Sequence, residues 1–151
     1  MKTAIVTGAN KGIGYEIARQ LGLKGFSVIV AARSKARGEE AMERLRALEI
    51  DARFIACDVG ELSSIRTAYT QVQQITSRID VLINNAGILH DENQGVFELS
   101  DAIFTHTIQV NALGALHIVR VFRPLLQQGS RVINISSSGG AICGGASTWA
   151  P

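Results

Sequence analysis

Short apolar runs rich in β-branched residues alternate along the chain with longer segments of helical period. Such runs are typical of buried strands, whereas apolar residues that recur at i, i+3 and i+4 indicate one face of a helix. The pattern predicts strands over residues 3–7, 26–32, 52–57, 80–84 and 131–136. The inner faces predicted for the three helices between the first four strands are Ile13, Ile17 and Leu21, then Ala41, Leu45 and Leu48 after a cap at Ser34, then Ile65, Ala68, Tyr69, Val72 and Ile75.

A fourth, longer helix is predicted from about Leu99 to Leu126, broken off near Pro124, because proline lacks the amide that a helix interior needs. Its apolar stripe consists of Phe104, Ile108, Ala112, Ala115 and Val119. Asn111 falls on this stripe, so its amide is expected to face inward, where a polar group without a hydrogen bond costs roughly 1–3 kcal/mol. Two interpretations stay open: a satisfied core asparagine, or an asparagine that serves the function.

Five strands that alternate with four helices define the fold class. Strands that are apolar almost throughout indicate a parallel sheet covered on both faces, and right-handed crossovers then favour a doubly wound arrangement. We therefore expect an α/β protein with a Rossmann-like, three-layer αβα architecture, in which residues 1–151 form a single domain. The tail from Ser137 to Pro151 is rich in Ser, Gly and Ala and has no packing period.

Composition and charge exclude several function classes. A chain of 151 residues with 46% hydrophobic and 19% charged residues can bury one core and is not typical of a disordered protein. The net charge of +2 gives no general attraction to nucleic acid or membranes, and no apolar run approaches the ~18 residues that span a bilayer. We expect a cytoplasmic protein that binds neither. No metal site is expected, because His90, His106 and His117 lie at no metal-ligand spacing.

Small and polar residues cluster where the predicted strands end. Ligands of open α/β sheets bind outside the carboxyl ends of the strands, so this clustering equips one edge of the sheet for chemistry. In the order of the five strands, the residues are Gly8, Arg33, Asp58, Asn84 with Asn85, and Ser136 with Ser137.

The first strand leads into a glycine-rich turn, T-G-A-N-K-G-I-G, from Thr7 to Gly14. Glycines allow a sharp turn and a close approach of the backbone to a pyrophosphate, and the N-terminus of the following helix offers amide donors. The spacing G-x-x-x-G-x-G differs from the commoner dinucleotide fingerprint G-x-G-x-x-G. The alternative is a turn that binds nothing. A P-loop fits worse, because Lys11 precedes the second glycine and no G-K-[ST] is present.

The end of the second strand distinguishes between the two nicotinamide cofactors. A carboxylate there would bind the ribose 2′-hydroxyl of NAD and repel a 2′-phosphate, but this strand ends Ala31-Ala32-Arg33. The guanidinium of Arg33 suits a phosphate, and Lys11 in the adjacent turn adds a second positive charge. Together they favour NADP, with two ordinary surface cations as the alternative.

Four motifs in register resemble the short-chain dehydrogenase/reductase family. They are the turn at Thr7–Gly14, Asp58-Val59, N-N-A-G at Asn84–Gly87, and Asn111 followed by I-N-I-S-S at Ile133–Ser137. The turn, with A-A-R after the second strand, is most similar to the NADPH-dependent carbonyl-reductase-like members. The resemblance implies an NADP-dependent oxidoreductase that transfers a hydride between NADPH and a carbonyl or alcohol substrate, a small molecule.

The resemblance also implies roles for individual residues. The cofactor-binding positions are Gly8, Asn10, Lys11, Gly12, Ile13, Gly14, Arg33, Asp58, Val59, Asn84, Ala86 and Gly87. Arg33 would meet the 2′-phosphate, and Asp58 would accept a hydrogen bond from the adenine amino group. The catalytic positions are Asn111, which would bend its helix and hold a water for proton relay, and Ser137, which would orient the substrate carbonyl. The serines on either side of Ser137 would be turn residues.

The sequence departs from the family pattern at the proton donor. The family protonates the developing alkoxide with the tyrosine of a Tyr-x-x-x-Lys motif. Tyr15 and Tyr69 are the only tyrosines, and neither is followed by lysine at i+4. We therefore expect a chain cut short before this motif, with a sheet incomplete on its C-terminal side and no appreciable reductase activity alone. A catalytically incomplete nucleotide-binding fragment or degenerate paralogue is the alternative function. A homo-oligomer is possible for the family and doubtful for such a fragment.

Overall fold

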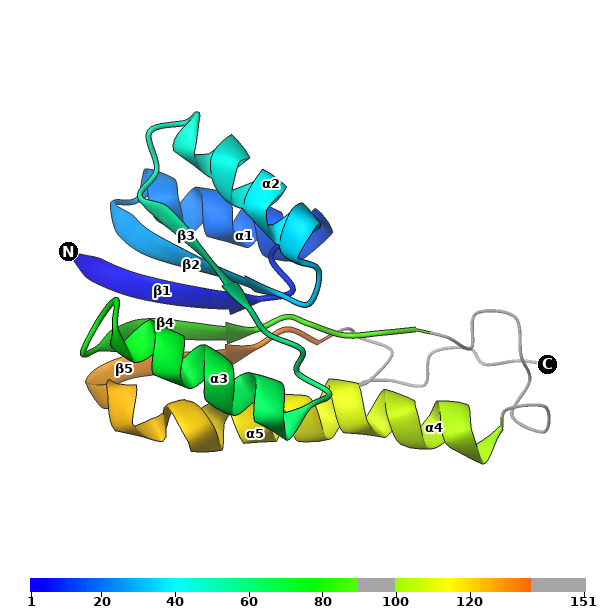
Figure 1. Cartoon of the computed structure of the whole chain (residues 1–151). Coiled ribbons are helices and arrows are strands. Elements are labelled where there is room, and N and C mark those ends of the chain that lie inside the picture. The colour runs from blue at the N-terminus through cyan, green and yellow to red at the C-terminus, as the bar shows by residue number, and fades with distance from the viewer. Residues whose placement is uncertain (90–99, 137–151) are drawn as a thin grey trace, which may run out of the picture.

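A computed structural model describes residues 1–89 and 100–136 of the chain. At its centre lies a sheet of five parallel strands: β1 (Lys2–Thr7), β2 (Phe26–Ala32), β3 (Ala52–Ala56), β4 (Ile79–Asn84) and β5 (Leu126–Asn134). The strand order is β3-β2-β1-β4-β5, so the chain builds one edge, returns to the centre and then builds the other edge (Figure 1). This reversal between β1 and β4 confirms the predicted doubly wound α/β sheet.

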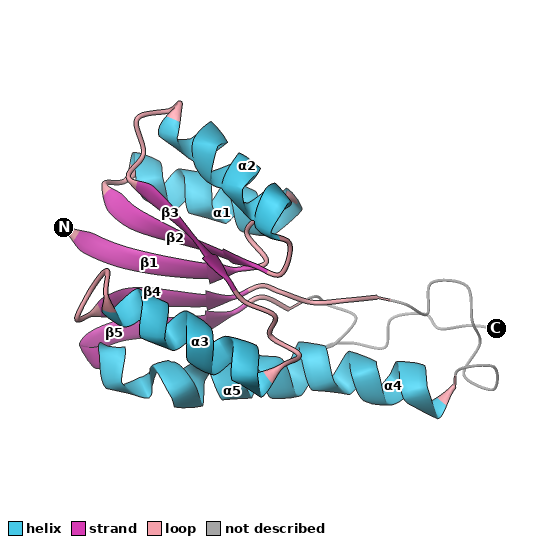
Figure 2. Ribbon diagram, viewed as in Figure 1, coloured by secondary structure: helices cyan, strands magenta, loops and turns pink. Residues whose placement is uncertain are grey.

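Helices cover both faces of the sheet, α1 and α2 on one and α3 and α5 on the other (Figure 2). Their bounds are Gly12–Leu23 for α1, Lys35–Arg46 for α2, Leu62–Gln73 for α3 and Gly114–Phe122 for α5. Along β2, Val28 and Val30 belong to the core under α1 and α2, whereas Ile29 belongs to the core under α3 and α5. This alternation explains why the strand is apolar throughout.

The predicted long helix is present but changes character along its length. α4 (Asp101–Ile108) passes into a π-helix, η1 (Gln109–Leu113), then into α5, and ends in a 3-10 turn, η2 (Arg123–Leu125). Pro124 lies in that turn, as expected for a proline at a helix end. β5 follows at once, so the fifth strand begins five residues earlier than the apolar run at 131–136 predicts.

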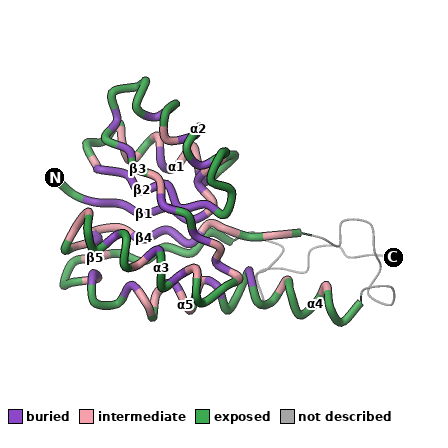
Figure 3. The backbone as a smooth tube through the Cα atoms, in the orientation of Figure 1, coloured by how far each residue is buried: buried purple, intermediate pink, exposed green. Residues whose placement is uncertain are grey.

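The buried face of this helix is not the one that the apolar spacing predicts. Its buried residues are Val110, Gly114, Ile118, Phe122 and Leu125. Phe104 and Ile108, on the predicted stripe, are 56% and 43% exposed, and Figure 3 shows α4 largely exposed. The physical reason is Gly114: a Cβ there would lie 2.7 Å from the carbonyl oxygen of Val59, so the helix packs through a residue that carries no apolar signal.

Two further positions on the predicted inner faces are exposed, Ile13 at 67% and Leu48 at 46%. Leu48 lies beyond the last residue of α2 and therefore no longer follows the helical period. Ile13 lies in the first turn of α1. The buried residues of this helix are Gly14 and Ala18, so its inner face does not include Ile13. Small residues again allow a close approach that hydrophobic periodicity does not reveal.

By length and composition, the helical run Asp101–Leu125 is apolar enough to cross a membrane, with a mean hydropathy of 1.2. Apolar runs in the sequence do not predict this segment, because polar residues such as Gln109 and Asn111 interrupt them. A single helix of this kind is weak evidence for membrane insertion, since helices that pack in protein cores pass the same test. Ile118 and Phe122 of this run are core residues.

An ion pair holds β1, β4 and β5 together at the end where these strands begin. Asp80 accepts hydrogen bonds from the amide of Thr3 at 2.8 Å and from Nε of Arg78 at 2.7 Å. Arg78 also donates to the carbonyl oxygen of Gln128 at 3.1 Å. Burial raises the pKa of Asp80, but these hydrogen bonds and the charges of Arg78 and Lys2 outweigh burial, so the pKa lies below its usual value.

We expect Asp80→Asn to lower the free energy of unfolding at pH 7 by about 1 kcal/mol, because the amide loses the charge that faces Arg78. The folded-state pKa lies below the unfolded one, so the carboxylate stabilises the fold above about pH 4 and loses this effect as pH falls through the folded pKa. Urea unfolding should therefore separate parent and variant at pH 7 more than at pH 3. Asp51→Asn, at an exposed site, serves as the control; a gap that does not depend on pH would contradict the prediction.

Candidate functional site

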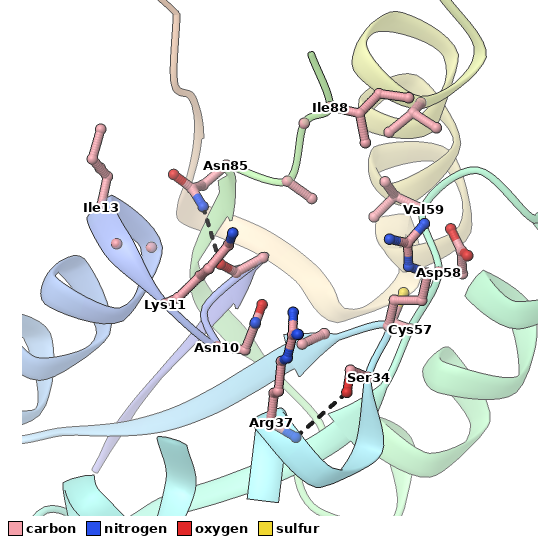
Figure 4. A pocket seen from close by; sticks show the side chains of 18 of the residues that line it. Asn10, Lys11, Ile13, Ser34, Arg37, Cys57, Asp58, Val59, Asn85 and Ile88 are labelled. Carbon is pink, nitrogen blue, oxygen red and sulfur yellow. Dashed lines mark hydrogen bonds between the residues drawn. The ribbon is translucent and has the colours of Figure 1, made fainter. Parts of the chain in front are cut away.

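A cavity of about 660 Å³ lies at the carboxyl ends of the strands, beside the point where the strand order reverses (Figure 4). Its walls come from the turn after β1, the end of β2 with the start of α2, the residues after β3 and β4, and the π-helix. All of the predicted cofactor positions line this cavity except Asn84. The cavity thus brings together four of the predicted strand-end residues, Gly8, Arg33, Asp58 and Asn85. Asn84 and Ser136 do not line it, and Ser137 lies outside the described residues.

The wall nearest β1 consists of backbone packed too closely for side chains. Gly8 has a φ of 66°, a left-handed conformation that favours glycine, and a Cβ there would lie 2.9 Å from Cα of Ala86. A Cβ on Gly14 would lie 2.6 Å from the carbonyl oxygen of Gly8. Both glycines are therefore required by close approach, and the backbone of this turn is open to a ligand.

Helix α1 presents an uncapped N-terminus to this turn. Among the described residues no side chain caps α1, and its first turn holds no acidic residue. By contrast, the hydroxyl of Ser34 caps α2 by accepting from the amide of Arg37. The first amides of a helix need acceptors and carry the positive end of the helix dipole, so the start of α1 is suited to an anion.

Thr7 and Asn85 fasten the glycine-rich turn to the end of β4. Oγ1 of the buried Thr7 accepts from the amides of Asn85 and Ala86, both at 3.0 Å, and donates to the carbonyl oxygen of Ile83 at 3.3 Å. Nδ2 of Asn85 donates to the carbonyl oxygens of Thr7 at 3.0 Å and Gly8 at 3.4 Å. These bonds fix the separation of two cavity walls.

The structure separates the two neighbouring asparagines after β4. Asn85 lines the cavity, whereas the buried Asn84 donates to Oδ1 of Asn134 at 2.9 Å and so braces β4 against β5. Oδ1 of Asn84 has no hydrogen-bond partner within the described part of the chain. The family motif assigns Asn84 to the cofactor wall and leaves out Asn85; the alternation of side chains at a strand end is the signal that distinguishes them.

Three cations give one side of the cavity a positive character. Arg33 directly follows β2, Arg37 lies in the first turn of α2, and Lys11 lies in the glycine-rich turn. All three side chains are exposed, and none forms an ion pair within residues 1–89 and 100–136. Figure 4 shows Lys11 and Arg37 reaching into the same space. The sequence analysis did not include Arg37 among the cofactor positions. Arg37 lies four residues after Arg33, in the first turn of the predicted helix, and this spacing could have indicated that both side chains lie at the same end of the sheet.

The residues after β3 form a pre-ordered wall. Oδ1 of Asp58 accepts from the amide of Gly60 at 3.0 Å, and the amide of Asp58 donates to Oγ of Ser64 at 2.9 Å. Cys57 also lines the cavity, but burial, aided by the charge of Asp58, raises the pKa of its thiol to about 12. Very little thiolate therefore forms near neutral pH, which disfavours Cys57 as a nucleophile.

Asn111 lies in the π-helix but does not face the core, so that expectation is wrong. It is exposed, because the buried face of the helix runs through Val110 and Gly114. Its Oδ1 accepts from the amide of Ile88 at 2.8 Å, and its Nδ2 donates to the carbonyl oxygen of Ile88 at 2.9 Å. The amide is thus satisfied by the segment after β4. The other predicted catalytic position, Ser137, lies outside the described residues.

A family model described as short chain dehydrogenase matches residues 2–148. Among curated proteins, carbonyl reductase [NADPH] 1 of Macaca fascicularis is 36% identical over 143 residues, covering 91% of this chain and 49% of that protein. A short chain dehydrogenase/reductase of Colletotrichum higginsianum is 38% identical over 150 residues, covering 91% of this chain and 36% of that protein. The chain therefore spans about half or less of the length of these relatives.

Solved structures agree in fold and in sequence. An actinorhodin polyketide ketoreductase crystallised with NADPH superposes with a TM-score of 0.83 at 31% identity, covering 93% of this chain and 56% of that one. A metagenomic short-chain oxidoreductase in complex with NADP superposes with a TM-score of 0.82 at 33% identity, covering 90% of this chain and 62% of that one.

Proposed function

This chain belongs to the short-chain dehydrogenase family, and on that premise we propose that it binds NADP(H) in the cavity at the strand ends. The protein it represents would transfer a hydride between NADPH and a small carbonyl or alcohol substrate. Three of the proteins compared above are either named for NADPH or were crystallised with NADPH or NADP, which supports the choice of cofactor.

The observation that carries the proposal is the N-terminus of α1, which no side chain among the described residues caps. It lies next to the backbone of Gly8 and Gly14, where there is no room for a Cβ. A pyrophosphate would accept from the first amides of α1, and the missing Cβ atoms of Gly8 and Gly14 leave room for it. The residues present therefore fit the diphosphate of a dinucleotide.

The cation cluster beside the end of β2 fits the 2′-phosphate that distinguishes NADP from NAD. Arg33 offers a planar fork of donors, and Arg37 and Lys11 line the same cavity. After the neighbouring strand β3, Asp58 uses Oδ1 for the amide of Gly60, and its second oxygen has no partner among the described residues, so it can accept from an adenine amino group. Val59 would lie against the ring.

When bound, NADPH supplies a hydride equivalent to the substrate carbon. The residues of this chain would hold and orient the reactants: Asn111 fixes the backbone of Ile88 beside the cavity, and the hydroxyl of Ser137 would donate to the substrate oxygen. Neither Tyr15 nor Tyr69 lines the cavity, so neither is placed to protonate an alkoxide. That observation favours a second candidate function, nucleotide binding without turnover.

We expect the chain to bind NADPH at least about tenfold more tightly than NADH, because one charge-assisted contact to the 2′-phosphate is worth that much. Titration followed by the fluorescence of the reduced nicotinamide measures both dissociation constants. Equal affinities would contradict the assignment of the cations, and absence of NADPH binding would overturn the proposal. NADPH binding without NADPH oxidation in the presence of aldehydes and ketones would favour the second function.

A further inference from the structure

The π-helix contacts the walls on two sides of the cavity through consecutive residues. Nε2 of Gln109 donates to the carbonyl oxygen of Gly60 at 2.8 Å, in the loop after β3. Val110 lines the cavity between the two loops. Asn111 bonds Ile88, in the segment after β4, in both directions. π-helices are rare and often occur at functional sites, and this one links two walls of the cavity.

Gly60 is the residue that this junction immobilises. A glycine has more conformational freedom than any other residue, so a loop that turns on one stays mobile unless its polar groups are engaged. Here both are engaged: the amide of Gly60 donates to Oδ1 of Asp58, and its carbonyl oxygen accepts from Gln109. The carboxylate of Asp58 and the side chain of Gln109 thus hold the same residue from opposite sides.

We propose that Gln109 is a positioning residue for the adenosine end of the cofactor. By fixing Gly60 it holds Asp58 and Val59 in the orientation that an adenine requires, although Gln109 itself does not line the cavity. The inference rests on the proposed function. In Figure 4, Ile88 and Val59 both lie beside the pale yellow-green helix that carries Gln109, with Asp58 below Val59.

Gln109 is exposed, so its side chain can be changed without disturbing the core. We expect Gln109→Met, which keeps length but removes the donor, to weaken NADPH and adenosine 2′,5′-bisphosphate by about threefold to tenfold, the effect of one hydrogen bond. Gln109→Glu, which has the same shape but cannot donate when ionised, should behave alike. Gln71→Met, at an exposed site on α3, is the matched control and should bind as the parent does.

Two further measurements separate positioning from a general loss of structure. In the chain without nucleotide, hydrogen exchange at the amide of Gly60 should be faster in Gln109→Met than in the parent, with an unchanged thermal midpoint. Competition by inorganic pyrophosphate, which lacks adenosine, should be the same in both proteins.

Each outcome bears on one claim. Failure of the parent to bind NADPH would overturn the proposed function and this inference with it. Binding by the parent with equal affinity in Gln109→Met, whether or not exchange at Gly60 changes, would overturn the inference alone. Equal weakening of pyrophosphate would also overturn it, because the effect would not be confined to the adenosine end.

Discussion

Arg33→Asp is expected to reverse the cofactor preference, weakening NADPH by about 100-fold while leaving NADH unchanged or tighter. The substitution removes a guanidinium suited to the 2′-phosphate and replaces it with a carboxylate that repels it. A charge-assisted hydrogen bond contributes roughly 1.5–3 kcal/mol, which corresponds to about 10- to 100-fold in affinity, and repulsion adds to the loss. A carboxylate at the end of β2 can also accept from the free 2′-hydroxyl of NADH.

Arg66→Asp provides a control with the same change of net charge. Arg66 lies exposed on α3 and does not line the cavity. Titrating both variants with both cofactors at low and moderate salt distinguishes a contact from a long-range field, because salt screens distant charges most. Comparable loss of NADPH affinity in the two variants would show that net charge, and not Arg33, sets the preference. Arg37 and Lys11 remain in Arg33→Asp, so binding of NADPH should be weakened rather than abolished.

The five strands and their parallel arrangement could be predicted from the sequence because buried parallel strands are apolar on both faces. Successive residues of β2 face opposite cores, Val28 and Val30 on one side and Ile29 on the other. A short run of residues that are all apolar is typical of such a strand, buried on both faces. The helix faces were less legible. Gly114 carries the closest packing of the long helix, yet hydrophobic spacing gives it no weight, so the predicted stripe through Phe104 and Ile108 is displaced from the buried one.

The residues of the candidate site also fall into two groups, those that could be predicted from the sequence and those that could not. Positions defined by glycine or by charge at a strand end, such as Gly8 and Arg33, follow from sequence because their backbone geometry or charge is specific to the residue type. Asn85 does not follow, since its role depends on hydrogen bonds to Thr7 and Gly8, far away along the chain. The exposed position of Asn111 was equally unpredictable, because it depends on which residues of the helix are buried against the sheet.

Gly14→Ala is expected to destabilise the glycine-rich turn by steric contact alone, because the φ of Gly14 is not left-handed. An added Cβ would contact Nδ2 of Asn85 and lie 2.6 Å from the carbonyl oxygen of Gly8. Neither atom can yield cheaply, because Nδ2 of Asn85 also bonds the carbonyl oxygen of Thr7 at 3.0 Å. We expect a loss of roughly 2–4 kcal/mol in the free energy of unfolding, together with at least tenfold weaker NADPH binding. Alanine normally stabilises a helix by up to about 1 kcal/mol over glycine, so a loss would report the contact and not the propensity.

Gly12→Ala is the matched variant for this prediction. Gly12 begins α1 with a φ of 57°, but a Cβ there would meet nothing within 4 Å. Its cost is therefore limited to the left-handed conformation, about 1–2 kcal/mol. Urea unfolding of both variants tests the ordering directly: if Gly12→Ala proves as destabilising as Gly14→Ala, backbone conformation and not the contact with Asn85 governs the turn. The expected result is a smaller loss of unfolding free energy in Gly12→Ala than in Gly14→Ala, with the hydrogen bonds of Asn85 broken only in Gly14→Ala. The hydrogen bonds that shape the ligand site would then also be the ones that stabilise the glycine-rich turn.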